Sequence, residues 1–221
     1  MFHVKQFDEL SKLNTFLKTE SIILSEQQIV KLKIYLTELI QFAAKHRIIS
    51  INDIDNIVSR HFLSSFYFVK NIKDIIKESD EILDLGSGAG FPGIVLSIYF
   101  PNRVTLVDSN RKKSLFLRRV QKELSLNCEV INERIENFVT ESNRQFNLIT
   151  ARALASIGDL IDLTSPLLNK SVLHTIKGLN FREELSGNEA EYLIIENTIA
   201  DTWIKYSEYL NNKIYISISS K

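Results

Sequence analysis

The sequence predicts an α/β protein: a doubly wound, mostly parallel sheet with an antiparallel C-terminal strand, preceded by an N-terminal helical extension. Three observations support this fold class. Residues 25–79 repeat apolar side chains at helical spacing, residues 81–178 alternate short apolar runs with helical patterns, and two strand-like runs close the chain. We therefore divide the chain into a helical extension, residues 1–80, and a sheet-bearing domain, residues 81–221.

The extension contains three stretches that are predicted to be helical. In residues 25–45, apolar side chains recur every three to four positions, and Ser25 with Gln28 has the spacing of a capping box. Ser50 with Asp53 is a second start of this kind. From there one helical face is expected to carry Ile54, Ile57, Val58, His61, Phe62 and Ser65, and a short helical patch follows at 69–79.

In the sheet-bearing domain, apolar runs of strand length alternate with helical patterns. The predicted strands lie at 81–86, 103–109, 128–134, 146–154 and 171–178. The predicted helices lie at 92–100, 110–126 and 156–168; that at 110–126 has Leu115, Phe116, Val120 and Leu124 as its inward candidates. Strands separated by helices of these lengths form parallel βαβ units with right-handed crossovers.

The end of the chain is expected to add an antiparallel hairpin. Residues 202–210 and 213–220 read as strands, and Asn211-Asn212 between them is a plausible turn. Residues 182–200 fit neither a helical nor a strand pattern, so no element is assigned there.

Composition excludes several classes of protein. Lys plus Arg and Asp plus Glu both number 27, so the formal net charge is zero and no global basic field attracts nucleic acid. Cys128 is the single cysteine, which rules out an internal disulfide, and the four histidines show no metal-ligand clustering. The chain lacks a leader pattern and an apolar run of about 18–20 residues, so we expect a cytoplasmic protein without a membrane or metal site.

A glycine-rich stretch at 86–93 is the strongest functional signal. Four of the seven glycines fall there, at Gly86, Gly88, Gly90 and Gly93. Phe91 stands where a dinucleotide fingerprint has its third glycine, and no Gly-Lys-Ser/Thr follows, so neither dinucleotide nor Walker spacing is present. Asp84 precedes the loop and Asp108 closes the next predicted strand. A carboxylate there can accept from both ribose hydroxyls, which favours a nucleoside-containing cofactor.

The loop and Asp108 resemble motif I and the acidic residue of class I S-adenosylmethionine-dependent methyltransferases, which have a Rossmann-like fold. A closer resemblance joins "RHFLSS", "LDLGSGAGFPGI", "LVDSNRKKSLFLRRV", "RIENF", "FNLITARALASIGDL" and "IKG", in that order. Together these resemble the glucose-inhibited division protein B family, the bacterial small-subunit ribosomal RNA methyltransferases G, over about residues 26–178. The resemblance implies S-adenosylmethionine as cofactor, and methylation of N7 of a guanine in 16S rRNA of the small subunit.

The resemblance also implies which residues form the site. Asp84, the three loop glycines and Phe91 would lie at the cofactor, Asp108 would hold the ribose, and Ile135 and Glu136 would lie beside the adenine. Arg152 would contact the cofactor and orient the acceptor base at the methyl-transfer side. Two departures matter: Ser64 stands where the family usually has Asp, and the extension lacks the family's Trp-Asn and Asn-Leu-Thr.

An RNA substrate requires a local basic patch, because the net charge is zero. Residues 110–122 contain six basic residues and no acid, and we assign RNA contact to Arg111, Lys112, Arg118, Arg119 and Lys122. A solvated helix face is the alternative reading. For His61, a packed helix position is expected over a place on the substrate rim. The protein is expected to act as a monomer on 16S rRNA or the small ribosomal subunit.

Three other functions remain open on the sequence alone. They are a class I methyltransferase acting on a different RNA, a protein or a small molecule; an NAD-dependent oxidoreductase, which Phe91 disfavours; and a non-catalytic ribosome-assembly factor. Guanine N7 has a lone pair and no proton, so no general base is required, and no Ser/His/Asp triad is expected.

Overall fold

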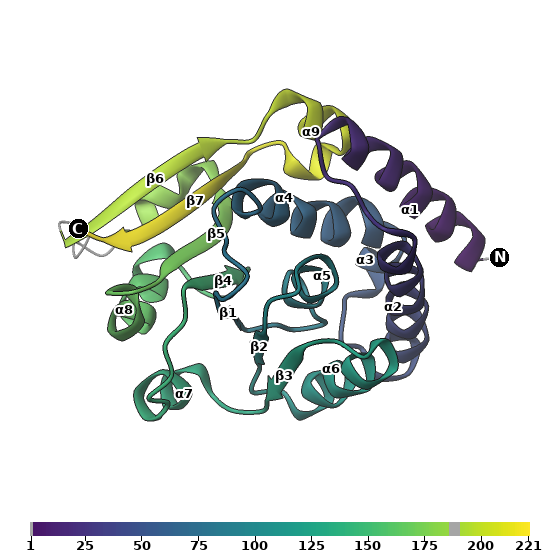
Figure 1. Cartoon of the computed structure of the whole chain (residues 1–221). Helices are drawn as coiled ribbons and strands as arrows, with labels where there is room; N and C mark the ends of the chain where they lie inside the picture. Colours follow the sequence, from purple (N-terminus) through teal and green to yellow (C-terminus); the bar gives the residue numbers. More distant parts are fainter. Residues whose placement is uncertain (1, 186–190) are drawn as a thin grey trace.

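The computed structural model describes residues 2–185 and 191–221, without the side chains of residues 2, 3, 51 and 52. A seven-stranded sheet with the order β3-β2-β1-β4-β5-β7-β6 runs through this described part (Figure 1). Its parallel strands are β1 (Ile82–Leu85), β2 (Val104–Val107), β3 (Cys128–Ile131), β4 (Leu148–Arg152) and β5 (Val172–Gly178). The predicted doubly wound, mostly parallel sheet is confirmed.

The order of the parallel strands reverses between β1 and β4. Leu85 at the end of β1 stands opposite Val107 of β2 and Ala151 of β4, so β1 and β2 end at the same level and β4 ends one residue beyond them. In doubly wound sheets, ligands bind beyond the carboxyl ends of the strands at such a switch point. The glycine-rich loop follows β1, and it therefore lies at this position.

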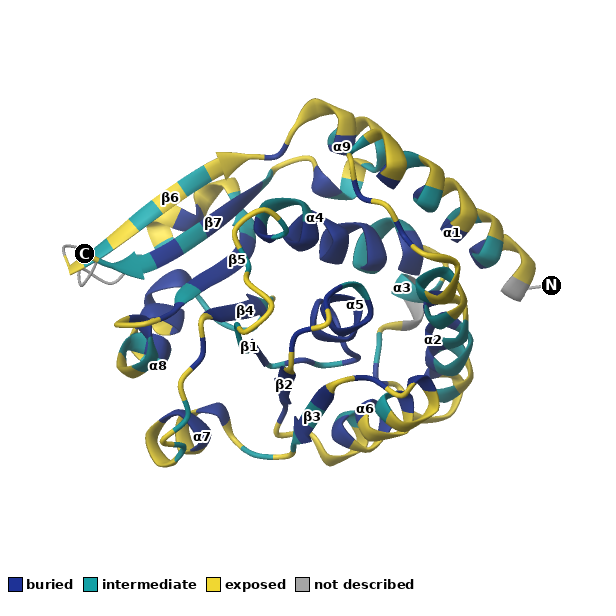
Figure 2. Cartoon of the chain, viewed as in Figure 1, coloured by how far each residue is buried: buried dark blue, intermediate teal, exposed yellow. Residues whose placement is uncertain are grey.

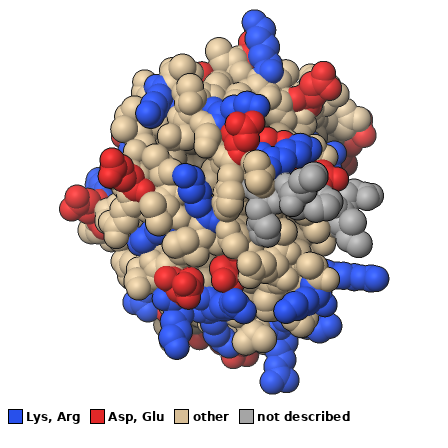
Figure 3. Space-filling model, turned by 90° about the vertical axis from the view of Figure 1, so that its right-hand side faces the viewer, with Lys and Arg blue, Asp and Glu red and all other residues tan. Residues whose placement is uncertain are grey.

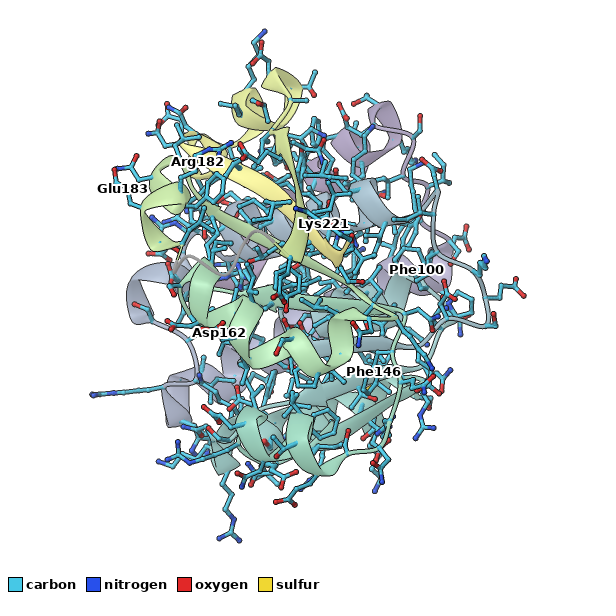
Figure 4. All side chains as sticks on the ribbon, turned by 90° about the vertical axis from the view of Figure 1, so that its left-hand side faces the viewer. Phe100, Phe146, Asp162, Arg182, Glu183 and Lys221 are labelled. Atoms are coloured by element: carbon cyan, nitrogen blue, oxygen red, sulfur yellow. The ribbon has the colours of Figure 1, made fainter. Side chains whose placement is uncertain are left out.

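Helices cover both faces of the sheet (Figure 1). One face carries α5 (Gly93–Tyr99) and α6 (Arg111–Leu124); the other carries α7 (Ile135–Glu141) and α8 (Ile157–Leu168). Along β1, Ile82 belongs to the first hydrophobic cluster, while Leu83 and Leu85 belong to the second, as the two-residue period of a strand requires. Figure 2 shows the central strands β1 and β2 and helix α5 almost wholly buried, whereas β6 (Tyr192–Thr198) at the edge of the sheet is intermediate or exposed along its length. Figure 4 shows α8, with Asp162, in front of the sheet.

The extension packs on the same face as α5 and α6. It comprises α1 (Phe2–Thr19), α2 (Glu26–His46), α3 (Ile51–Ile54), the π-helical turn η1 (Val58–Phe62) and α4 (Leu63–Ile72). Its apolar side chains belong to the same hydrophobic cluster as that face of the sheet. The predicted division of the chain into two domains after residue 80 stays a prediction.

The two predicted helix caps have different outcomes. The Ser25 hydroxyl accepts from the Gln28 N–H at 3.2 Å, and the Gln28 side chain accepts from the Ser25 N–H at 2.8 Å, so the capping box is confirmed. The Gln28 amide also donates to the carbonyls of Ile98 and Tyr99, which ties α2 to the end of α5. The Ser50 side chain makes no capping bond, so the second predicted cap is wrong and only the short α3 forms there.

The predicted C-terminal hairpin is wrong in its first strand. Residues 202–210 form α9 (Asp201–Tyr206) and the 3-10 turn η4 (Glu208–Leu210), because Trp203 is buried against Phe16 and Tyr67 and donates to the Glu20 carboxylate at 2.7 Å. β7 (Lys213–Ser220) is a strand as predicted, and it lies antiparallel between β5 and β6 (Tyr192–Thr198).

Three smaller differences complete the comparison. The stretch 182–200, which received no assignment, contains β6 and the end of η2 (Leu179–Glu184). Within it, residues 186–190 lie outside the described residues. The strand predicted at 128–134 is shorter in the structure, where β3 ends at Ile131 and α7 begins at Ile135. Leu115 is 61% exposed, so it was wrongly expected to face inward; Leu117 is buried instead.

Candidate active site

The glycine-rich loop between β1 and α5 depends on backbone conformations that favour glycine. Gly86, Gly88 and Gly90 have φ values of +64°, +59° and +102°. The space around them differs. A Cβ at Gly86 would lie 2.6 Å from Leu154, and one at Gly90 would lie 2.6 Å from Ile94. At Gly88 the nearest atom would be the Gly86 carbonyl at 3.7 Å, so the backbone there is open to the close approach of a ligand.

Asp84 lies beneath this loop and is fully buried. Its carboxylate accepts from the Thr150 hydroxyl at 2.7 Å and from the Gly93 N–H at 3.2 Å. Burial raises the pKa of Asp84 to about 6, although these hydrogen bonds act in the opposite direction. The side chain thus joins β1, β4 and the first turn of α5, and fixes the base of the loop.

Asp108, which directly follows β2, lies against the glycine-rich loop. One carboxylate oxygen accepts the Gly88 N–H at 2.8 Å, and the other accepts the Asn110 N–H at 2.7 Å. The Asp108 carbonyl accepts from Ser114 and Asn132, so the backbone is held as well. A carboxylate offers about four lone-pair sites, and the two remaining sites can accept from the hydroxyls of a ribose.

Ile135 and Glu136 begin α7, beyond the carboxyl end of β3. Ile135 is buried and Glu136 is exposed in the first helical turn. Because β3 is the strand next to β2, these two residues follow the same edge of the sheet as Asp108. An apolar side chain beside an exposed carboxylate suits a heterocycle with a polar edge.

Arg152 ends β4, on the other side of the switch point from Asp108. Its guanidinium donates to the Phe91 carbonyl at 3.4 Å and to the Ser64 hydroxyl at 3.1 Å, and it lies 2.8 Å from Nδ1 of His61. The guanidinium carbon lies 5.5 Å from the centre of the Phe91 ring. Burial lowers the pKa of Arg152, but an arginine remains charged at neutral pH.

Tyr35 of α2, which was not among the predicted site residues, also contacts the glycine-rich loop. Its hydroxyl donates to the Ala89 carbonyl at 2.7 Å, and its ring lies 5.3 Å from that of Phe91 and 5.4 Å from that of Phe62. Because Tyr35 also continues the apolar face of its helix, the sequence carries no signal that separates it from an ordinary core residue.

Five basic residues of α6 were predicted to contact RNA, and they lie in two settings. Arg111, Lys112 and Lys122 are exposed around the exposed Leu115. Arg118 and Arg119 are exposed too, but Arg118 donates to the Val130 carbonyl at 3.1 Å, and Arg119 forms an ion pair with Glu38 of α2 at 2.6 Å. Figure 3 shows Lys and Arg gathered along the lower edge of this side of the molecule, with some acids between them.

No group of three or more His, Cys, Asp or Glu side chains among the described residues is placed to hold a metal ion. None of the described helices combines the length and the apolar character that a bilayer span requires.

Comparison with known proteins places this geometry in a family. Residues 28–206 match the family model GidB, rRNA small subunit methyltransferase G. The chain is 39% identical to ribosomal RNA small subunit methyltransferase G of Ectopseudomonas mendocina over 77% of this chain and 79% of that protein. It is 36% identical to the protein of the same name from Mycoplasma capricolum, over 69% of this chain and 65% of that protein.

A solved structure agrees with the fold. The chain resembles a mutant of MtNAS in complex with S-adenosylmethionine, with a TM-score of 0.57 and 14% identity, over 86% of this chain and 75% of that chain. At this identity the likeness concerns the Rossmann-like fold alone. The extent of the family match and the identity to its curated members show that the chain belongs to the rRNA small subunit methyltransferase G family.

Proposed function

We propose that the protein transfers a methyl group from S-adenosylmethionine to N7 of a guanine in the 16S rRNA of the small ribosomal subunit. One observation carries this proposal: in a chain of this family, the glycine-rich loop and Asp108 are joined by a hydrogen bond at the switch point of the sheet. This is the position where doubly wound sheets bind nucleoside cofactors.

The residues at the switch point fit S-adenosylmethionine. This cofactor contains an adenosine but no pyrophosphate, which agrees with a loop that lacks dinucleotide spacing. The open backbone at Gly88 gives room for close approach, and Gly86, Gly90 and Phe91 would complete the cradle. Asp108 would accept from the ribose hydroxyls, while Asp84 would support the loop from below.

The adenine would lie beside α7. Ile135 offers an apolar surface for the ring, and the backbone of Ile135 and the carboxylate of Glu136 are candidates for its polar edge. The pKa of adenine is too low for it to be charged at neutral pH, so Glu136 would act as a hydrogen-bond acceptor for the amino group.

The transfer itself requires orientation rather than proton chemistry. Bound S-adenosylmethionine supplies an electrophilic methyl group on a sulfonium that departs as a neutral thioether. Because N7 carries a lone pair and no proton, the residues of this chain need only hold the base in line with that methyl group. Arg152 could donate to guanine O6 or to a nearby phosphate from its place at the end of β4.

The exposed face of α6 is proposed as the RNA-binding surface. Arg111 and Lys112 begin the helix just beyond Asp108, so phosphates bound there would run past the cofactor site. Lys122 extends the same face, and Arg118 and Arg119 flank it with N–H donors that their bonds within the protein leave free. All these residues come from one chain, and we propose that the protein acts as a monomer.

Incubation with radiolabelled S-adenosylmethionine tests the proposed substrate. Three acceptors are compared: small subunits from a strain that lacks this activity, free 16S rRNA, and large subunits. Label in the small-subunit RNA alone is expected. Equal label in large subunits, or no label in any RNA despite measured cofactor binding, would remove 16S rRNA as the substrate.

A further inference from the structure

We infer that His61 of the helical extension is a positioning residue for Arg152, which it holds in place without neutralising its charge. The inference rests on the proposed function, because it assumes that Arg152 faces the acceptor base. It concerns a contact between η1 and the end of β4, two segments that are 91 residues apart along the chain.

The His61 ring and the Arg152 guanidinium share one neighbour, Phe91 of the glycine-rich loop. The imidazole is stacked on the phenyl ring, with the centroids 5.2 Å apart and the planes at 25°. The guanidinium carbon lies 5.5 Å from the centre of the same ring. Nδ1 of His61 lies 2.8 Å from Nη2 of Arg152. The extension therefore holds Arg152 against the loop that cradles the cofactor.

The hydrogen-bond chemistry fixes the form of the imidazole. A guanidinium has donors and no acceptor, so Nδ1 of His61 must accept and cannot carry a proton. The proton of the neutral ring is then on Nε2, which is buried and lies 3.7 Å from the nearer carboxylate oxygen of Asp53. Burial is the main cause that lowers the pKa of His61 to about 3, and the charge of Arg152 contributes in the same direction.

The acceptors around the Arg152 guanidinium are all neutral. They are the His61 imidazole, the Ser64 hydroxyl and the Phe91 carbonyl. The nearby carboxylates have other partners: Asp53 pairs with Arg60 at 2.5 Å, and Asp84 accepts from Thr150 and Gly93. Half-buried guanidinium groups are usually paired with carboxylates. Because the three acceptors of Arg152 are neutral, its positive charge stays available for an incoming acceptor.

Two N–H groups remain for that acceptor. A guanidinium has five, and the three bonds above use one each from Nε, Nη1 and Nη2. The remaining N–H of Nη1 and that of Nη2 can donate to guanine O6 or to a phosphate oxygen of the substrate. If His61 did not accept from Nη2, the long side chain would sample other rotamers and lose this orientation.

Two substitutions at one position separate the acceptor from the ring. His61→Phe keeps an aromatic ring against Phe91 and removes the acceptor. His61→Asn removes the ring but keeps an acceptor oxygen close to the place of Nδ1. Initial rates are measured with subunits lacking the methyl group, cofactor affinity is measured by calorimetry, and the melting temperature of each variant reports folding.

The expected result is a loss of turnover that the acceptor restores. In His61→Phe, kcat falls roughly tenfold or more while the cofactor Kd changes less than about twofold, and His61→Asn recovers most of the loss. In an Arg152→Ala background, His61→Phe has little further effect, because the contact it removes is already absent. Unchanged kcat in His61→Phe, or equal losses in both backgrounds, would overturn the inference.

Two measurements do not depend on any variant. Nitrogen-15 NMR of the full-length wild-type protein should show the neutral Nε2–H tautomer of His61, and an Nδ1–H tautomer would overturn the inference. The kcat of the wild type should not change between about pH 7 and 8, above the pKa of about 6 of the buried Asp84, whereas a general base with an ordinary histidine pKa would already lower it towards pH 7. If wild-type protein labels no RNA at all, the proposed function fails, while the tautomer still reports on the contact itself.

Discussion

Among single residues, the glycines of the cofactor loop show how much depends on the absence of a side chain. Gly90 has a φ of +102°, and a Cβ there would lie 2.6 Å from Ile94 and 2.8 Å from the Tyr35 hydroxyl. Gly178, at the end of β5, has an ordinary backbone and no atom within 4 Å of an added Cβ. The two positions therefore form a matched pair.

We predict that Gly90→Ala destabilises the fold by roughly 2 kcal/mol or more, through backbone strain and the clash with Ile94. Gly178→Ala should change the free energy of unfolding by less than about 1 kcal/mol. Urea unfolding of both variants measures the difference. Equal stability of the two would contradict the loop conformation described above.

His174 of β5 makes stability depend on acid pH. Its Nδ1 shares a hydrogen bond of 2.8 Å with the buried Tyr215 hydroxyl, and burial lowers its pKa to about 4. Between about pH 6.5 and 4 the unfolded chain takes up a proton that the folded protein does not, so stability falls as the pH falls through this window. The loss should reach roughly 3 kcal/mol near pH 4. Unfolding free energies of the wild type and His174→Gln test this, and the variant should lose this part of the pH dependence.

Two other groups, His61 and Asp84, also change stability as the pH falls, so the effect of His174 must be measured as a difference between variants. His61, with its lowered pKa, adds to the loss on acidification. Asp84 acts in the opposite direction, because its pKa of about 6 means that the folded protein binds a proton that the unfolded chain releases. The difference between the wild type and His174→Gln isolates the one histidine. A variant with the same pH dependence as the wild type would refute this account of His174.

At the scale of elements, α2 links the extension to the cofactor loop. The Tyr35 hydroxyl donates to the Ala89 carbonyl, and the Gln28 amide caps the end of α5 from the same helix. We predict that Tyr35→Phe costs about 1–2 kcal/mol of stability, since the ring stays and the buried Ala89 carbonyl loses its donor. It should also weaken cofactor binding, because the loop is less firmly held. Calorimetric titration with S-adenosylmethionine measures this, and an unchanged affinity would show that α2 does not support the loop.

The basic face of α6 makes a prediction about salt. If Arg111 and Lys112 contact phosphates, the double change to Gln should lower RNA affinity and reduce the salt slope by roughly 0.7–0.9 per lost contact. Arg119→Gln should reduce it less, because Arg119 is already paired with Glu38. Lys31→Gln is the control, since Lys31 is half-buried on α2 close to Ser97–Pro101, at the opposite end of α5. Filter binding over a range of salt measures the slopes, and equal slopes for all variants would remove α6 from the RNA-binding surface.

The elements also show what the sequence could and could not predict. The five parallel strands and α2, α6 and α8 carry a strong apolar period, and all of them form. Residues 202–210 misled because Trp203, Tyr206 and Leu210 have helical spacing within a stretch rich in strand-forming residues. α7 was missed because its two turns are too short to show a period.

The candidate site also contains contacts that the sequence could predict and contacts that it could not. Asp108 and the glycine-rich loop close neighbouring parallel strands, so their meeting follows from the order of the strands alone. The contacts of Tyr35 with Ala89 and of His61 with Arg152 span 54 and 91 residues. Both residues look like core positions on helices, and only the packing of the extension brings them to the loop.

On the scale of the whole molecule, the sheet, the loop and the extension converge at one place. The strand order reverses between β1 and β4, with Asp108 on one side and Arg152 on the other. Helices of the extension lie beside the sheet (Figure 1) and contribute Tyr35, His61 and Ser64 to the loop and to Arg152. Cofactor binding and base orientation thus depend on segments that are far apart in the chain.

If this switch point passes a methyl group to one guanine, the transfer must require Asp108. The direct test is to incubate the wild type and Asp108→Ala with methyl-labelled S-adenosylmethionine and small subunits lacking the methyl group, and to map the label by nucleoside analysis. With the wild type, label is expected at N7 of a single 16S rRNA guanine. With Asp108→Ala, whose folding is checked by its melting temperature, this label should be lost. Label on another atom or another molecule, or full activity of Asp108→Ala, would contradict this account.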